Sequence, residues 1–162
     1  MKELKQRIAG FLFLAAGLLA AGGAHATGSL RELRQLSFGH IAVTGAAPQT
    51  VTMSPAGVES ASGGITLLMP RGENGIYQLT GYAPNTSLWI TIAQASMDRQ
   101  AGGASLTLDN FIFSPDCTMA TPCSTDGAGE LTVGIGATLT TQPATSYGPG
   151  PYRAAYDLLL NF

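Results

Sequence analysis

Charged residues are scarce in this sequence. Of 162 residues, 8 are Lys or Arg and 10 are Asp or Glu, so charged residues make up 11% of the chain. An average soluble domain has about 25%. So few cations exclude a general nucleic-acid-binding protein, because phosphate binding needs clustered Lys and Arg. A hydrophobic share of 45% excludes an intrinsically disordered chain, which would combine low hydrophobicity with high charge.

Residues and motifs typical of catalytic sites are also missing. The chain has two Cys and two His, and His40 beside Gly39 is more typical of a surface or capping residue than of a general base. No G-x-S-x-G elbow, phosphate-binding loop or distinctive carboxylate pair occurs. Asp126–Glu130 is interpreted as an acidic turn, because it lacks the ligand spacing of a calcium loop. We therefore expect a protein that is not an enzyme and has no catalytic residue, cofactor or metal.

No apolar run is long enough to cross a bilayer. The longest, Ile8–Ala21, has 14 residues, whereas a spanning helix needs roughly 20. It follows a cationic start and precedes an A-x-A site, Ala24-His25-Ala26, which is the pattern of a secretory signal peptide. We predict removal of a helical leader, residues 1–26, leaving a single domain, residues 27–162, that contacts a membrane only through its export signal. An uncleaved anchor is the alternative.

Cys117 and Cys123 are separated by five residues, and both remain after the leader is removed. Export implies an oxidising compartment, so we predict a disulfide between them. Closing so short a loop stabilises a fold by roughly 2–2.5 kcal/mol in the chain-entropy model, which suits a staple at a loop tip. A redox pair is the alternative, although such pairs usually have C-x-x-C spacing.

Apolar residues alternate with small or polar ones along much of the chain, which is typical of half-buried strands. The alternation slips at Gly39-His40, and again near Asp109-Asn110, where we expect a β-bulge. Leu30, Leu33 and Leu36 recur every three residues, which fits a helical turn as well as a strand. Turn residues separate the runs, so the pattern favours an antiparallel sandwich or small barrel. The predicted strands cover residues 36–38, 41–43, 51–53, 77–80, 88–92, 106–113, 131–140 and 152–162.

Aromatic side chains offer candidate contact residues. Trp89 is out of phase with Leu88 and Ile90, so we expect it to face away from the core. Trp89 and Tyr82 are the candidate residues for contact with a ligand such as a sugar or with a partner protein. Covering a loop or a second layer is the alternative for Trp89. The last strand is the candidate association strand, through Tyr152, Tyr156, Leu158, Leu160 and Phe162. Its terminal Phe also fits a small outer-membrane β-barrel.

Several short motifs follow one another in a characteristic order. They are Leu36-Ser37-Phe38-Gly39-His40-Ile41, Val51-Thr52-Met53-Ser54-Pro55, Ser62-Gly63-Gly64, Tyr77-Gln78-Leu79-Thr80-Gly81, Leu88–Ile92, Leu131–Leu139, Gly150-Pro151-Tyr152 and Asn161-Phe162. Together they resemble the bacterial secreted domain-of-unknown-function family four-four-zero-two, from about Leu36 to Phe162. The resemblance implies an exported, immunoglobulin-like or pilin-like all-β sandwich, and it brings no catalytic residues.

Pilin-type subunits polymerise by donating an N-terminal strand to a neighbour. Here only Thr27–Gln35 precede the first motif, and their leucines are not in strand phase, which argues against such a donor. We expect an exported, non-enzymatic surface or fimbria-like structural or adhesive subunit, forming a homo-oligomer or pilus-like assembly with a periplasmic chaperone as a candidate partner. The alternative is a periplasmic or secreted carbohydrate-binding module. The expected location is the periplasm, the cell surface or the extracellular space.

Overall fold

The computed structural model describes residues 3–6, 28–45, 47–143 and 145–162. Within them, every regular element is a β-strand. No apolar helix of membrane-spanning length occurs among these residues. The strands are β1 (Glu3–Gln6), β2 (Ser29–Arg34), β3 (His40–Val43), β4 (Thr50–Met53), β5 (Glu59–Ala61), β6 (Ile65–Leu68), β7 (Gly75–Thr80), β8 (Ser87–Ile92), β9 (Ala95–Arg99), β10 (Leu106–Ser114), β11 (Cys123–Ser124), β12 (Leu131–Thr140), β13 (Tyr152–Ala154) and β14 (Leu158–Asn161). Most of the predicted leader lies outside the described residues.

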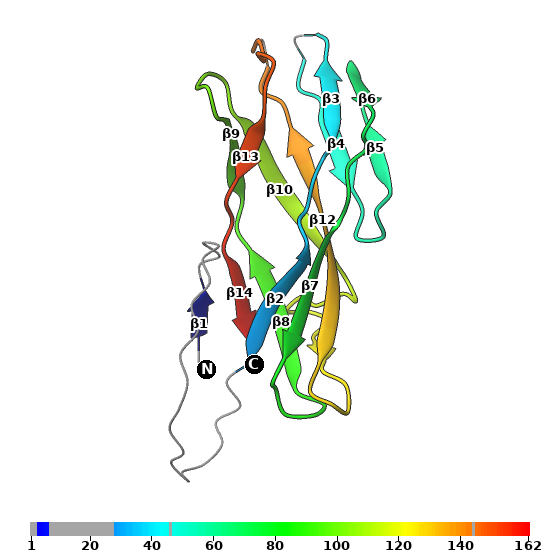
Figure 1. Cartoon of the computed structure of the whole chain (residues 1–162), viewed down its shortest axis with the longest axis vertical. Helices are drawn as coiled ribbons and strands as arrows, with labels where there is room; N and C mark the ends of the chain where they lie inside the picture. Colours follow the sequence, from blue (N-terminus) through cyan, green and yellow to red (C-terminus); the bar gives the residue numbers. More distant parts are fainter. Residues whose placement is uncertain (1–2, 7–27, 46, 144) are drawn as a thin grey trace.

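Two long antiparallel ribbons form the frame of the molecule (Figure 1). In the first, β2 pairs with β7 and β3 pairs with β6. In the second, β14 pairs with β8 and β13 pairs with β9. Between them β12 pairs with β10 on one side, and on the other with β7 and then β4. The predicted all-β antiparallel sandwich is confirmed.

Along one edge, β12 pairs first with β7 and then with β4, and a glycine in β12 makes this change of partner possible. The partner of β12 changes from β7, which pairs with Leu131–Ile135, to β4, which pairs with Ala137–Thr140. A Cβ at Gly136 would lie 2.1 Å from the carbonyl oxygen of Met53. Only glycine therefore lets the chain that leaves β4 cross β12 at this point.

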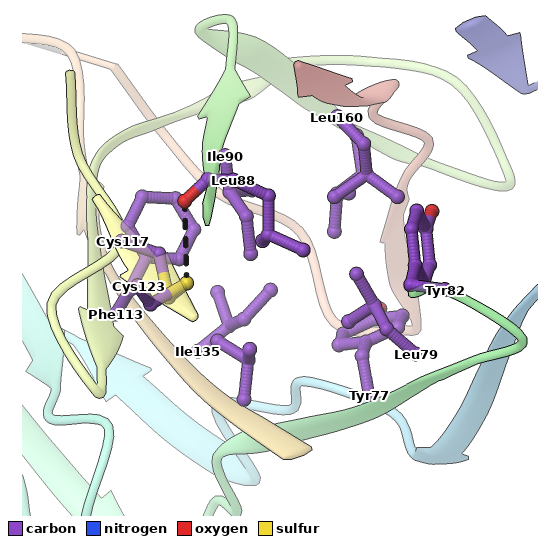
Figure 2. Packing of buried hydrophobic residues seen from close by; sticks show 12 residues of the cluster. Tyr77, Leu79, Tyr82, Leu88, Ile90, Phe113, Cys117, Cys123, Ile135 and Leu160 are labelled. Carbon is purple, nitrogen blue, oxygen red and sulfur yellow. Dashed lines mark hydrogen bonds between the residues drawn. A yellow bond between two sulfur atoms is a disulfide. The ribbon is translucent and has the colours of Figure 1, made fainter. Parts of the chain in front are cut away.

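The core consists of two clusters. The disulfide cluster packs residues of β7, β8, β10, β12 and β14 around the cysteines (Figure 2); its members are Tyr77, Leu79, Tyr82, Leu88, Ile90, Phe113, Cys117, Cys123, Val133, Ile135, Leu158 and Leu160. The groove cluster lies at the other end of the sandwich; its members are Phe38, Val51, Met53, Ile65, Leu106, Leu108, Ala137 and Leu139. Both clusters are built from the apolar phase of the strands, as alternation predicts.

Two local expectations have clear outcomes. The register of β10 against β12 shifts between Asp109 and Ile112, which confirms the predicted bulge. The leucine-rich segment that also fitted a helical turn forms β2, and the register shift beside Leu33 leaves that side chain 48% exposed. The bulge accommodates leucines at a spacing of three, because an extra residue changes which face the following side chain reaches.

The last strand differs from its prediction. The sequence predicts one strand over residues 152–162, whereas the structure has β13 and β14 separated by Ala155–Asp157. Tyr156 lies in this break, packs against the groove cluster and shares a 2.7 Å hydrogen bond with the hydroxyl of Tyr77. The segment passes here from the groove cluster to the disulfide cluster. Exposure nevertheless alternates without a slip from Pro151 to Leu158.

Candidate functional site

The two ribbons leave a seam between the N-terminal and C-terminal strands. Among the described residues, the strands β2, β3 and β13 each pair on one side only. At the groove-cluster end, where β3 and β13 lie (Figure 1), the seam widens into a cavity of about 1700 Å³. Its walls are Leu36–Val43 and Tyr147–Tyr156, and we call it the seam groove.

Main-chain groups on both walls point into the seam groove. Thr44 N–H donates to the Gly64 carbonyl, so alternation along an antiparallel pair turns the main chain of Ile41 and Val43 away from β6. Gln100 N–H donates to the Pro151 carbonyl, which by the same rule turns Tyr152 and Ala154 away from β9. No main-chain hydrogen bond between described residues joins the two walls. These strand edges are therefore open to pairing.

The inner surface of the seam groove is apolar. Leu106, Leu108 and Leu139 line it but are at most 4% exposed, because wall side chains cover them. Tyr147 and Tyr152, which pack against the same cluster, remain half-buried, with ring centroids 6.4 Å apart. A strand lying along the groove would bury these rings and satisfy the main-chain groups of the walls, which gives this arrangement the chemistry of a strand-binding site.

A tyrosine pair closes the end of the groove nearest the disulfide cluster. The hydroxyls of Tyr77 and Tyr156 lie 2.7 Å apart, and Glu32 of β2 lines the groove beside Tyr77. Burial raises the pKa of both hydroxyls above the usual tyrosine value, and the neighbouring Tyr156 and Glu32 raise that of Tyr77 further. Both tyrosines therefore stay neutral at physiological pH and act as hydrogen-bonding groups.

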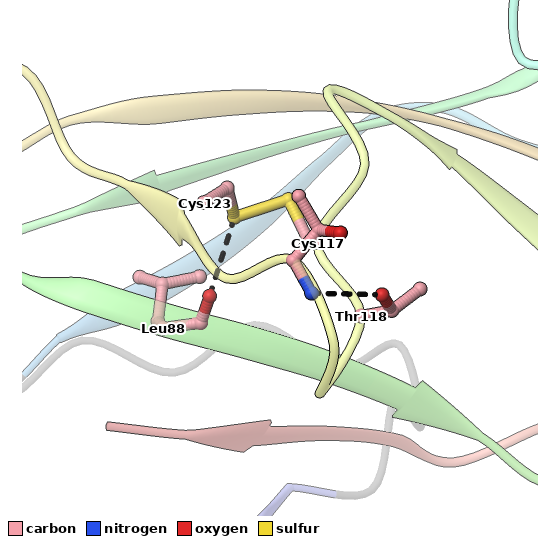
Figure 3. The surroundings of a disulfide bond; sticks show 5 residues. Leu88, Cys117, Thr118 and Cys123 are labelled. Atoms are coloured by element: carbon pink, nitrogen blue, oxygen red, sulfur yellow. Dashed lines mark hydrogen bonds between the residues drawn. A yellow bond between two sulfur atoms is a disulfide. The ribbon is translucent and has the colours of Figure 1, made fainter.

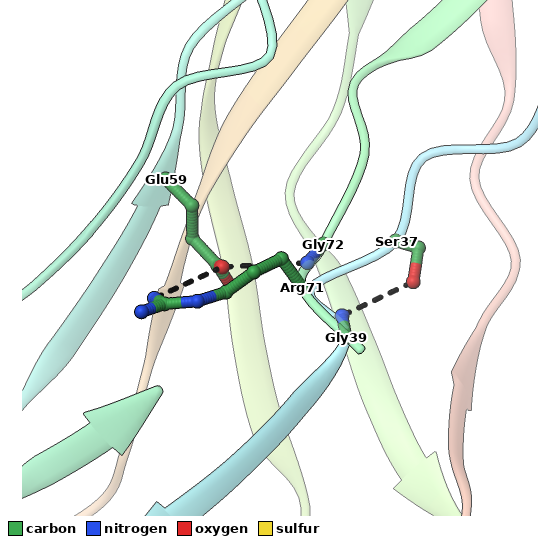
Figure 4. A network of polar contacts seen from close by, with 5 residues as sticks. All are labelled: Ser37, Gly39, Glu59, Arg71 and Gly72. Carbon is green, nitrogen blue, oxygen red and sulfur yellow. Dashed lines mark hydrogen bonds and ion pairs between the residues drawn. The ribbon is translucent and has the colours of Figure 1, made fainter. Parts of the chain in front are cut away.

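A polar network positions the N-terminal wall (Figure 4). Gly39 has a φ of 59°, and a Cβ there would lie 2.5 Å from the backbone of Arg71 and Gly72. Gly39 N–H donates to Ser37 Oγ, while Gly72 N–H donates to the Glu59 carboxylate, which also lies 3.8 Å from the Arg71 guanidinium. The apolar alternation slips at Gly39-His40 because the chain passes close to Arg71 and Gly72 there, which only a glycine permits, and then continues as β3 along the groove. His40 itself is exposed.

Arg99 fixes the loop above the C-terminal wall. Its guanidinium donates from Nη2 and Nε to the carbonyl of Pro149, at 2.8 and 3.1 Å, and from Nη1 to the carbonyl of Gly102. The Tyr152 hydroxyl donates to the Gly148 carbonyl at 3.2 Å. These bonds hold the loop before β13 in place.

The predicted disulfide between Cys117 and Cys123 is confirmed, with Cα atoms 4.7 Å apart (Figure 3). Its place differs from the expected loop tip, because the two cysteines are 0% and 7% exposed and belong to the core. Cys123 also pairs with Leu88 of β8. The bond therefore fixes the loop after β10 against the disulfide cluster.

The two candidate contact residues have different surroundings. Trp89 is half-buried on β8 between the buried Leu88 and Ile90, and it takes part in none of the aromatic pairs of the described residues. Tyr82 is 7% exposed, packs edge-on against Phe162 and touches Gly28, so the expectation of a surface contact at Tyr82 is corrected. Burial also raises the pKa of Tyr82. Trp89 alone remains of this candidate surface.

The candidate association strand contributes its edge. Leu158 and Leu160 are 1% and 4% exposed, so these two side chains are committed to the core, whereas Phe162 packs against Tyr82 and stays 43% exposed. Tyr152 and Tyr156 line the seam groove. The residues that sequence reasoning missed are those of the opposite wall, above all Ile41 and Val43. Their alternation predicted a strand, but no local signal places them across from residues more than 100 positions later.

The acidic turn is held by its own backbone. The Asp126 carboxylate accepts hydrogen bonds from the N–H groups of Ala128 and Glu130, both at 2.9 Å, and these lower the pKa of its carboxyl group. Across the described residues, no three His, Cys, Asp or Glu side chains gather where they could hold a metal ion.

Comparison with known families identifies the family of this chain. A family model described as Domain of unknown function (DUF4402) matches residues 29–162, from the first residue of β2 through β14. The chain belongs to this family. No curated protein and no solved structure matches it. The DUF4402 domain thus includes both walls of the seam groove and both core clusters.

Proposed function

We propose that this DUF4402 protein is an exported, non-enzymatic structural or adhesive subunit of a cell-surface, fimbria-like assembly. The observation that carries the proposal is the seam groove, where unpaired strand edges flank a cavity lined by half-buried tyrosines. Unpaired edges are usually protected by lysine, proline or a covering loop, because they otherwise pair with other chains. An edge left open beside an apolar groove suits a protein that works by association.

The surface composition supports this proposal. Residues 27–162 contain five Arg, no Lys and nine acidic residues. Copies of such a domain repel one another weakly, and no lysine protects the edges of β3 or β13. The predicted leader would carry the protein to the periplasm, the cell surface or the extracellular space. A periplasmic chaperone that covers the open edges before assembly is a fitting partner.

Cell fractionation with electron microscopy of surface material tests the proposal. We expect the native protein in a surface or sheared fraction, as oligomers, and a loss of surface material or adhesion when its gene is deleted. A strictly monomeric protein whose deletion changes neither surface material nor adhesion would contradict the proposed function.

The alternative, a carbohydrate-binding module, rests on Trp89. Trp89 alternates with two buried neighbours on β8 and is itself only half-buried, so part of this aromatic side chain is accessible to a sugar. A glycan screen of the exported protein and of Trp89→Ala tests this alternative. Binding that disappears in the variant would support it, whereas an identical profile for both proteins would remove it.

A further inference from the structure

The strand edge formed by β13, residues 155–157 and β14, which we call the C-terminal edge, would be unpaired along its whole length after loss of the leader. In the structure β1 lies antiparallel along β14, with Glu3 opposite Asn161 and Gln6 opposite Leu158. The edge therefore accepts an antiparallel strand. Since β1 falls within the predicted leader, cleavage after Ala26 would leave β14 unpaired on that side, in line with β13.

The pattern of this edge is complementary to itself. From Pro151 to Leu158 exposed and covered residues alternate, and the exposed series includes Arg153, Ala155 and Asp157. Two copies in antiparallel register centred on Ala155 would place Arg153 of each copy opposite Asp157 of the other. Ala154 would then face Tyr156, and both are groove-lining residues. Half-buried residues of one copy thus lie opposite half-buried residues of the other, and two Arg153–Asp157 pairs form between the copies. Both features are those that cross-strand pairing favours.

We propose that the processed chain binds a second copy of itself through the C-terminal edge, in a two-fold antiparallel pairing centred on Ala155. This inference rests on the proposed function and names its first partner. The interface is isologous, since the same edge serves both copies. It joins the β13–β9 ribbons of two copies into a continuous sheet, and the seam groove provides room for the partner's strand.

The chain's own architecture favours whole-edge pairing over a donated segment. Thr27–Gln35 cannot act as a free donor, because β2 within it already pairs with β7 over most of its length. A two-fold pairing uses β13 and the adjoining residues 155–157, which are already in place along the seam groove.

Charge reversal tests the register. In the exported, processed protein, Arg153→Asp and Asp157→Arg each place like charges opposite one another twice per dimer. Each should raise the dimer dissociation constant by about tenfold or more. The double variant Arg153→Asp/Asp157→Arg should restore dimerisation. Sedimentation equilibrium measures association, and urea unfolding checks stability separately, because Asp98 of β9 lies opposite Arg153 in the same molecule.

The matched control is Arg31→Asp on β2, an exposed charge on the opposite wall of the seam. We expect this variant to dimerise like the parent. If it alone weakens association, the edge of β2 and β3 is the interface. The proposed pairing is then wrong, although the protein still associates with itself. Dimers that tolerate all the reversals would contradict the register in the same way.

Hydrogen exchange gives an independent readout. In the dilute monomer the amides of Tyr152 and Ala154 should exchange quickly, while that of Arg153, which faces β9, is protected. Dimerisation should slow exchange at Tyr152 and Ala154. Unchanged exchange there in a proven oligomer would overturn this inference and leave the proposed function intact, whereas a monomer at every concentration, with no surface assembly, would contradict both.

Discussion

The two halves of this sandwich have the same kind of strands but differ in how they are closed. Around the disulfide cluster, strands from both ribbons cover the core, and Cys117–Cys123 ties the loop after β10 to it. Around the groove cluster, β3 and β13 lie on opposite sides of a cavity of about 1700 Å³. One half thus has a core closed by both ribbons and a disulfide, whereas the other keeps two unpaired strand edges on either side of a cavity.

The largest expected effect tests whether the two cores are equally constrained. Leu79 of the disulfide cluster and Leu139 of the groove cluster are 0% and 2% exposed. We expect Leu79→Ala to cost about 4 kcal/mol and Leu139→Ala about 2.5 kcal/mol, because the tyrosines beside the groove can move into the space left by Leu139. Urea unfolding of the exported protein measures both. Equal losses of unfolding free energy would mean that the groove cluster adjusts to a cavity no more readily than the disulfide cluster does.

The next effect concerns the disulfide. Replacing both Cys117 and Cys123 by Ala should lower the free energy of unfolding by about 2.4 kcal/mol, the chain-entropy value for so short a loop. Exchange should accelerate at amides of the disulfide cluster and stay unchanged at those of β3 and β13. The parent protein under reducing conditions is the control. An equal acceleration in both halves would show that they open as one unit.

The smallest effect concerns the tyrosine pair at the boundary between the halves. Tyr156→Phe removes the partner of the Tyr77 hydroxyl and should cost about 1 kcal/mol at neutral pH.

The same variant should change the alkaline limb of the stability curve. The pKa values of Tyr77 and Tyr156 are raised in the folded state. Their stabilising contribution is therefore complete below the unfolded-state pKa of about 10 and is lost as pH rises above it. Stability should fall less steeply above that pH in Tyr156→Phe than in the parent. Parallel curves in urea unfolding would contradict this assignment.

Local signals predicted much of the fold. Alternation located most strands because every second side chain of a half-buried strand faces the core. It failed at the last strand, where the break at residues 155–157 depends on Tyr156 reaching Tyr77. It says nothing about Tyr82, a candidate contact residue in the sequence that the structure buries against Phe162. In both cases the deciding contact comes from a distant segment.

The sequence by itself determined the strand pattern, the low charge and the disulfide, because each depends on neighbours within a few residues. Only the tertiary structure decided that Leu36–Val43 and Tyr147–Tyr156 line one cavity and that no main-chain bond between described residues closes it. The physical reason is that a strand's free edge depends on which strands pair beside it, and pairing is settled by packing across the whole chain. The scarcity of charge matters most along these edges, because residues 27–162 contain no lysine that would oppose pairing with another chain.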